Sequence, residues 1–162
     1  MKQIIQSGKP AYGVSVQFPS PEIVEMIGEL NFDWVMLDAE HGSITADNIG
    51  PMIMAAEIRG LTPIVRPENN DPSVINKYLD RGAMGVQVPH INTADEARAV
   101  VDACLYHPQG MRGLGGGRMA DFGWGSPVSE YVKTANSEML VCVQIEDVIA
   151  VENLDEILNV PN

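Results

Sequence analysis

Three observations on the sequence predict an α/β fold with parallel strands. Short apolar runs alternate with helical patterns along the chain, and this order is typical of parallel strands joined by right-handed crossovers. Polar residues follow two of these runs, at Asp38 to His41 and at Gln144 to Asp147. The chain has 162 residues, of which 45% are hydrophobic and 20% charged. We therefore expect one globular domain over residues 1–162.

The first part of the chain contains three expected strand–helix pairs. The strands span residues 12–18, 33–40 and 63–66, and the helices span residues 21–30, 45–59 and 71–80. Thr45 is a suitable N-cap for the second helix, and Gly60 is a suitable stop. Asp71 suits the N-cap of the third helix because Pro72 follows at the first helical position.

Two further strand–helix pairs are expected, with strands at residues 85–91 and 140–146 and helices at residues 93–105 and 148–158. Thr93 and Glu96 have the spacing of a capping box. Five such units are compatible with an open doubly wound sheet, whereas a complete eight-stranded barrel needs ~250 residues.

A glycine-rich connection over residues 106–126 interrupts the alternation and carries Arg112, Arg118 and Trp124. A long segment without secondary structure inside a compact domain is usually functional or disordered. The spacing of Gly113 and Gly115 superficially resembles a dinucleotide-binding motif, but this segment follows an expected helix rather than a strand. A lid or a loop that contacts substrate is the better interpretation.

The net charge of −12 argues against some partners and compartments. Such a charge repels phosphate backbones and anionic lipid, so we expect neither nucleic acid nor a membrane as a partner. Residues 1–13 do not have the pattern of a signal peptide, and no apolar run is long enough to span a membrane. Cys104 and Cys142 lack metal-ligand spacing. A cytoplasmic protein with reduced thiols is expected.

The polar strand ends predict a metal-assisted acid/base site, because loops that leave the carboxyl ends of parallel strands converge. His41 becomes a candidate general base beside Asp38 and Glu40, since a carboxylate orients an imidazole and raises its basicity. A single histidine is more commonly a helix cap or a loop residue. His90 has weaker support because no acidic residue is adjacent in the sequence.

The positions of the lysines separate two kinds of carbon–carbon chemistry. A Schiff-base aldolase needs a buried lysine near the strand ends. Here the lysines lie in the N-terminal segment or on helical patterns, at Lys2, Lys9, Lys77 and Lys133. Carbon–carbon chemistry in this chain would therefore need a metal that acts as a Lewis acid on a carbonyl oxygen.

Several motifs together resemble those of the HpcH/HpaI aldolase family, the class II aldolases of 2-keto-3-deoxy sugar acids and 4-hydroxy-2-oxo acids. The motifs are Asp38-Ala39-Glu40-His41, Val65-Arg66-Pro67, Tyr78-Leu79-Asp80, Val88-Pro89, Gly110 to Gly115, and Val143-Gln144-Ile145-Glu146. They occur in the family's order and spacing over nearly the whole chain. The resemblance implies a TIM (β/α)8 barrel, of which about the first five βα units are present.

The resemblance also implies an activity, that of a cytoplasmic lyase in the catabolism of aromatic compounds or sugar acids. This lyase would cleave a 2-oxo acid to pyruvate and an aldehyde, with Mg²⁺, Mn²⁺ or Co²⁺ as cofactor. It would be a homo-oligomer, which is a hexamer in the family. Glu146 would be a metal ligand, and the second ligand is expected beyond Asn162. Arg66, Gln144 and Gly115 would contact the substrate.

Proton transfer is assigned by the same resemblance. His41 would take the proton from the substrate's 4-hydroxyl, directly or through water. Asp80 would be the acidic partner of His41. Asp38 would hold neighbouring site residues in position. Two other hypotheses stay open, a non-catalytic α/β module that binds a small anion and an inactive aldolase fragment that only assembles with partner chains.

Overall fold

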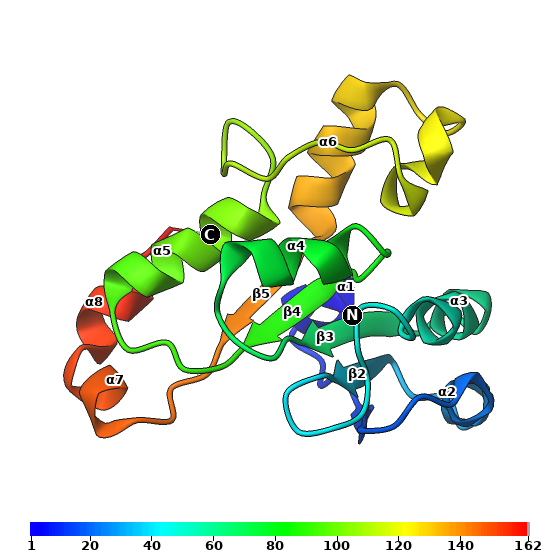
Figure 1. The fold of residues 1–162 in the computed structure, drawn as a ribbon, viewed down its shortest axis with the longest axis horizontal. Coiled ribbons are helices and arrows are strands. Elements are labelled where there is room, and N and C mark those ends of the chain that lie inside the picture. The colour runs from blue at the N-terminus through cyan, green and yellow to red at the C-terminus, as the bar shows by residue number, and fades with distance from the viewer. Residues whose placement is uncertain (162) are drawn as a thin grey trace.

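The computed structural model describes residues 1–161, which contain a five-stranded parallel sheet (Figure 1). Its strands are β1 (Gly13–Val16), β2 (Trp34–Asp38), β3 (Thr62–Arg66), β4 (Gly85–Val88) and β5 (Leu140–Val143). Neighbours in the sheet are neighbours in the sequence, in the order β1-β2-β3-β4-β5. An open doubly wound sheet reverses this order at its switch point. The consecutive order is therefore that of a barrel segment.

Helices lie between the strands and at both ends of the described chain. They are α1 (Lys2–Gln6), α2 (Pro21–Glu29), α3 (Gly50–Ile58), α4 (Pro72–Leu79), α5 (Ala94–Cys104), the 3₁₀ helix η1 (Arg118–Gly123), α6 (Val128–Glu138), α7 (Val148–Glu152) and α8 (Leu154–Leu158). Helix α2 packs against α3, α4 against α5, and α5 against α8. Within the described residues, no helix has the length and hydropathy needed to cross a membrane.

The sheet separates the core from the site, because successive side chains in a strand point to opposite faces. Val35, Leu37 and Val65 are fully buried in the main apolar core. Asp38 and Arg66 occur at the alternate positions of the same strands and end β2 and β3. The strands thus bury one row of apolar side chains and present polar side chains from the other row at their carboxyl ends.

Two expected helix starts are confirmed by side-chain caps. Thr93 accepts a hydrogen bond from the Glu96 backbone N–H, and the Glu96 carboxylate accepts from the Thr93 N–H, which completes the capping box. Asp71 accepts from the Ser73 N–H, and Pro72 occupies the first helical position of α4. These caps fix the beginnings of the helices that follow β3 and β4.

Two expected helices differ from the structure. The helix expected over residues 45–59 begins at Gly50, because the Asn48 side chain accepts from the Thr45 N–H and holds residues 45–48 in a turn. The helix expected over residues 148–158 is divided at Asn153 into α7 and α8. The Asn153 side chain donates to the Asn92 carbonyl oxygen at 2.9 Å, which ties this break to the β4–α5 loop.

The glycine-rich connection is less irregular than expected, since η1 and α6 lie between Arg118 and Glu138. The apolar spacing of Val128, Tyr131, Val132 and Ala135 is a helical signal that our sequence interpretation missed. Helix α6 has no fully buried residue. It lies apart from the sheet in Figure 1, so the sheet's pattern does not predict it.

Candidate active site

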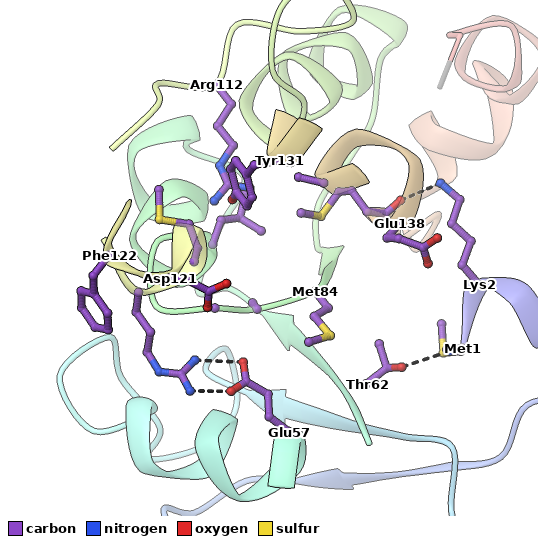
Figure 2. A pocket seen from close by; sticks show the side chains of 17 residues that line it. Met1, Lys2, Glu57, Thr62, Met84, Arg112, Asp121, Phe122, Tyr131 and Glu138 are labelled. Atoms are coloured by element: carbon purple, nitrogen blue, oxygen red, sulfur yellow. Dashed lines mark hydrogen bonds and ion pairs between the residues drawn. The ribbon is translucent and has the colours of Figure 1, made fainter. Parts of the chain in front are cut away.

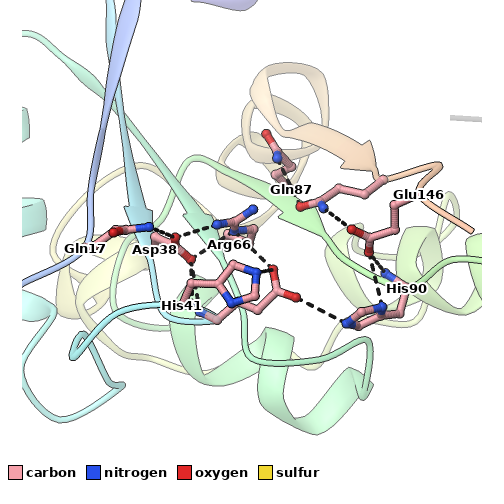
Figure 3. Close-up of polar contacts among 9 residues, drawn as sticks. Gln17, Asp38, His41, Arg66, Gln87, His90 and Glu146 are labelled. Atoms are coloured by element: carbon pink, nitrogen blue, oxygen red, sulfur yellow. Dashed lines mark hydrogen bonds and ion pairs between the residues drawn. The ribbon is translucent and has the colours of Figure 1, made fainter.

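Polar side chains from four strands and their following loops meet at the carboxyl end of the sheet (Figure 3). Asp38 and Arg66 end adjacent strands and are directly paired in the β2–β3 register. His90 follows β4, and Gln144 and Glu146 follow β5. The consecutive strand order places these ends side by side, as a parallel barrel requires.

Asp38 is fully buried and accepts hydrogen bonds from three sides. Its Oδ2 accepts from Gln17 Nε2 at 3.1 Å, and its Oδ1 accepts from the backbone N–H groups of Glu40 and His41 at 3.1 and 3.2 Å. Both oxygens also accept from Arg66, at 2.9 and 2.5 Å. Burial alone would raise the pKa of Asp38, but these donors, Arg66 above all, lower it to about 2.

Arg66 connects two buried carboxylates. Besides its two-point contact with Asp38, its Nε lies 3.2 Å from Glu40 Oε2. The hydrogen bonds that Arg66 donates to Asp38 raise the pKa of Arg66 further above its usual value, and the negative charges of Glu40 and Glu146 act in the same direction. Arg66 is therefore a fixed positive charge at the strand ends.

The β5 side of the site is built around Glu146. The Glu146 Oε2 atom accepts from Gln144 Nε2 at 2.9 Å, and Gln144 Oε1 accepts from Gln87 Nε2 at 3.1 Å. The Glu146 Oε1 atom accepts from the backbone N–H of His90 at 2.7 Å. Because a carboxylate offers about four lone-pair positions, Glu146 keeps capacity for a cation or a substrate.

His90 links the two halves of the site, although it had weaker support from the sequence than His41. Its Nε2 lies 3.2 Å from Glu40 Oε1, and its Nδ1 lies 3.2 Å from Glu146 Oε1. The acidic partners come from other strands, which is why adjacency in the sequence does not reveal them. The usable signal was its position at a strand end, the criterion that also selected Arg66.

His41 lies at the same edge but is held more loosely. Its backbone is bound to Asp38, its side chain is 63% exposed, and its Nε2 lies 3.7 Å from Glu40 Oε2. An exposed imidazole beside a carboxylate and an arginine is accessible to a substrate hydroxyl.

Asp80 and Gly115 are not brought to this edge within the chain. Asp80 forms the C-cap of α4, and its Oδ1 lies 3.5 Å from the buried Arg112 NH2. Gly115 belongs to the glycine-rich connection, near Met119, and Gly117 in the same segment approaches the Asp80 backbone. Because α4 runs back from the carboxyl ends of the strands, both residues lie toward the opposite end of the sheet from His41.

That opposite end has a cavity of its own, with a volume of about 440 Å³ (Figure 2). Its polar lining side chains include Lys2, Glu57, Arg112 and Arg118. Arg118 forms a two-point ion pair with Glu57, and Lys2 Nζ donates to the Met139 carbonyl oxygen at 2.9 Å. Most of the charge in this cavity is already paired, so the strand-end site is the better candidate for chemistry.

The donor set at the strand ends fits a hard divalent cation only in part. Glu146 offers carboxylate oxygens, and Glu40 Oε2 is buried without a hydrogen-bond donor. Within residues 1–161, no three His, Cys, Asp or Glu side chains are grouped closely enough to hold an ion. The described residues would therefore supply only part of the ligands of a cation at Glu146.

Comparison with known families gives a match over most of the chain. The family described as HpcH/HpaI aldolase/citrate lyase matches residues 12–162. Among curated proteins, a 4-hydroxy-2-oxo-heptane-1,7-dioate aldolase of Escherichia coli is 35% identical over 159 residues, and a hydroxypyruvate/pyruvate aldolase of Deinococcus radiodurans is 33% identical over 156 residues. These alignments cover 98% and 96% of this chain but 60% and 56% of the relatives. The chain thus spans less than two thirds of their length.

Solved structures give the same result for the fold. An HpcH/HpaI aldolase from Desulfitobacterium hafniense superposes with a TM-score of 0.92 at 32% identity, covering 99% of this chain and 62% of that one. The citrate synthase SbnG superposes with a TM-score of 0.86 at 32% identity, covering 97% and 60%. The five parallel strands match a part of these longer chains, which confirms the expected partial barrel.

Proposed function

Because the chain belongs to the HpcH/HpaI aldolase/citrate lyase family, we propose that it is a divalent-metal-dependent aldolase or the amino-terminal part of one. The proposed reaction cleaves a 4-hydroxy-2-oxo acid or a 2-keto-3-deoxy sugar acid to pyruvate and an aldehyde. Its proposed compartment is the cytoplasm.

The observation that carries this proposal is the juxtaposition of Arg66 with Gln144 and Glu146 at one edge of the sheet. Retro-aldol cleavage leaves an electron pair on carbon 3 of the substrate, which spreads onto the keto oxygen as an enolate. A fixed cation near that oxygen stabilises the developing charge more than it stabilises the neutral ketone. Arg66 already has its guanidinium oriented by Asp38, so little reorganisation is needed during the reaction.

His41 is the proposed base. As the bond between carbons 3 and 4 breaks, the 4-hydroxyl oxygen becomes the aldehyde oxygen and must lose its proton. The exposed imidazole of His41 accepts that proton, directly or through water, and the pyruvate enolate later gains a proton at carbon 3. The Asp38 hydrogen bond to the His41 backbone fixes where this loop leaves β2.

Glu146 is the proposed metal ligand, and Gln144 orients it through the 2.9 Å hydrogen bond. When bound, Mg²⁺, Mn²⁺ or Co²⁺ supplies Lewis-acid polarisation of the substrate's keto group. Gln144 and Gly115 are the remaining proposed substrate contacts.

The position of Asp80 bears on the proposed assembly. Asp80 and Gly115 lie away from His41 in the same chain, so a pairing of Asp80 with His41 requires a second copy. This is consistent with the homo-oligomer that we propose. A mass measurement of the purified chain in solution tests that assembly directly.

The activity is tested by a coupled assay of pyruvate release from 4-hydroxy-2-oxo acids, with added Mn²⁺ and with chelator. We expect release that chelator abolishes and that Glu146→Gln reduces by at least about tenfold. Glu152→Gln is the matched control, since Glu152 is exposed on α7. Pyruvate release that persists in chelator would overturn the metal-dependent mechanism.

A binding measurement separates the two other hypotheses. Pyruvate and Mn²⁺ together should raise the melting temperature of an aldolase site. Binding without turnover would support a non-catalytic anion-binding module. Neither binding nor turnover would support a fragment that only assembles with partner chains.

A further inference from the structure

Gln17 extends to β1 the row of polar side chains that Asp38 and Arg66 form across the sheet. Val16, the last residue of β1, is paired with Leu37, so Gln17 follows level with Asp38. Asp38 is paired in turn with Arg66. Side chains at one level of neighbouring strands point to the same face. Gln17 is exposed at that face, whereas Val16 is buried in the apolar core.

The contact with Asp38 determines which end of the Gln17 amide is free. Gln17 Nε2 donates to Asp38 Oδ2 at 3.1 Å. Despite its burial, Asp38 has its pKa lowered to about 2 by Arg66 and the other donors, so its ionised carboxylate only accepts hydrogen bonds near neutral pH. The opposite orientation of the amide would place two oxygens against each other. Gln17 Oε1 therefore faces away from Asp38, and within residues 1–161 it accepts no hydrogen bond.

The backbone of Gln17 lies against the loop that carries His41. The Ser43 N–H donates to the Gln17 carbonyl oxygen at 2.8 Å. The same oxygen approaches Gly42 so closely that no side chain would fit there. The Gln17 amide and the His41 imidazole are thus held on neighbouring segments at the mouth of the site.

The order of the side chains along this edge indicates where each part of a substrate would lie. Figure 3 shows Gln17 and Glu146 at opposite ends of the group, with Arg66 and His41 between them. In the proposed function, the pyruvate portion lies at Glu146 and Arg66, and the 4-hydroxyl lies at His41. The carbon atoms beyond carbon 4, which become the rest of the aldehyde, therefore extend toward Gln17.

The charges on this side of the site favour an uncharged aldehyde portion. Residues 10–58, which include β1, β2 and the loops that follow them, contain no lysine or arginine. Arg66 is already engaged by Asp38 and Glu40. His41 must be neutral to act as the proposed base. A carboxylate beyond carbon 4 would find no unpaired cation among these residues, whereas a hydroxyl would find the free Oε1 of Gln17.

We propose that Gln17 selects the aldehyde portion of the substrate by accepting a hydrogen bond from one of its hydroxyl groups. The preferred substrates are then 2-keto-3-deoxy sugar acids with an uncharged, hydroxylated far end. Substrates whose far end is a carboxylate or an alkyl group are disfavoured. This proposal rests on the proposed function, since it concerns the same site.

The test is the reverse reaction, in which carbon 3 of the pyruvate enolate bonds to the aldehyde carbon and the aldehyde oxygen gains a proton. The full chain is assayed with pyruvate, Mn²⁺ and one of three aldehydes: glyceraldehyde, propanal or succinic semialdehyde. We expect the kcat/KM for glyceraldehyde to exceed that for propanal by about three- to tenfold, the usual contribution of one hydrogen bond. Succinic semialdehyde should also be used less well than glyceraldehyde.

The variant is Gln17→Met, which keeps the length of the side chain and removes its amide. The kcat/KM for every aldehyde should fall, because Asp38 loses a donor. The kcat/KM for glyceraldehyde should fall about three- to tenfold further than that for propanal. Gln6→Met is the matched control, since Gln6 is exposed at the end of α1 and should leave this ratio unchanged. Circular dichroism checks that both variants are folded.

The outcomes separate this proposal from the proposed function. Equal losses for glyceraldehyde and propanal in Gln17→Met would mean that Gln17 only holds Asp38, and an unchanged ratio without any loss would mean that it has no role. Either result would overturn the proposal, as would wild-type use of succinic semialdehyde equal to that of glyceraldehyde. If the wild type formed no aldol product from any of the three aldehydes, the proposed function would fail together with this proposal.

Discussion

Asp38 and Arg66 form a two-point ion pair at the ends of adjacent strands, with Arg66 Nε 2.9 Å from Asp38 Oδ1 and NH2 2.5 Å from Oδ2. The two residues are direct partners in the β2–β3 register. The pair orients the guanidinium. It also offsets the free-energy cost of burying the charged carboxylate of Asp38. The same contact therefore links folding stability to the chemistry that we propose.

The first prediction concerns pH. The folded-state pKa of Asp38 is lowered to about 2 from its ordinary 3.8, so the ionised carboxylate stabilises the fold above the higher value. This contribution should be about 2 kcal/mol near neutral pH and should be lost as the pH falls from about 4 to about 2. The measurement is the free energy of unfolding of the wild type and of Asp38→Asn between pH 7 and pH 2.

The difference between the two proteins is the informative quantity, because other carboxylates titrate in both. We expect the wild-type advantage to stay constant above about pH 5 and to shrink toward acid. A difference that is independent of pH across this range would mean that Asp38 stabilises the fold by packing rather than by its charge.

The second prediction concerns Arg66→Lys. Lysine keeps a positive charge but cannot make the two-point contact with Asp38 while it also lies beside Glu40. Pyruvate release should fall by about 10² or more, the usual loss when an oriented donor to a developing oxyanion is removed. Because one positive charge remains beside two buried carboxylates, the variant should stay folded. Steady-state kinetics and circular dichroism measure both outcomes.

Arg59→Lys is a suitable control, since Arg59 forms ion pairs with Glu25 and Glu29 on the partly exposed outer surface. Its pyruvate release should be unchanged. If Arg66→Lys also had unchanged pyruvate release, Arg66 would be a structural partner of Asp38 and would have no catalytic role.

The sequence predicted the parts of the fold that depend on local pattern. The five strands and the capping box at Thr93 follow from apolar runs and from residue spacing, and the structure confirms them. The late start of α3 follows from the Asn48 side chain bonding to the Thr45 backbone. Such side-chain bonds compete with helix formation. They do not change the spacing of apolar residues along the sequence, so that spacing does not reveal them.

Contacts at the strand ends could be predicted where the two residues share a strand or its end. Gln144 and Glu146 are two residues apart and interact as expected from strand alternation. His90 is bound to Glu40 and Glu146, which are 50 and 56 positions away, so its partners depend on strand order. Asp80 was assigned from the family resemblance, and within the chain its carboxylate lies beside Arg112. Its pairing with His41 stays a prediction.

The third prediction concerns the capping box of α5, the helix that follows the His90 loop. Thr93→Ala removes the oxygen that accepts from the Glu96 N–H and should lower the free energy of unfolding by about 1 kcal/mol. Thr134→Ala is the matched control, since Thr134 is exposed within α6 and caps nothing. Urea denaturation of both variants provides the comparison. A loss in the control as large as that in Thr93→Ala would rule out the capping explanation.

The fourth prediction separates the two proton transfers of the proposed reaction. His41→Asn should slow pyruvate release from a 4-hydroxy-2-oxo acid by about 10²-fold or more, because the 4-hydroxyl loses its base. Exchange of the pyruvate methyl protons in D₂O does not involve that hydroxyl and should fall much less. Because the His41 side chain is 63% exposed, the variant should keep its melting temperature. Proton exchange by NMR and the coupled release assay, run on one preparation, give both rates. Equal losses in the two rates would instead assign His41 to the carbon 3 proton or to binding of the shared pyruvate portion.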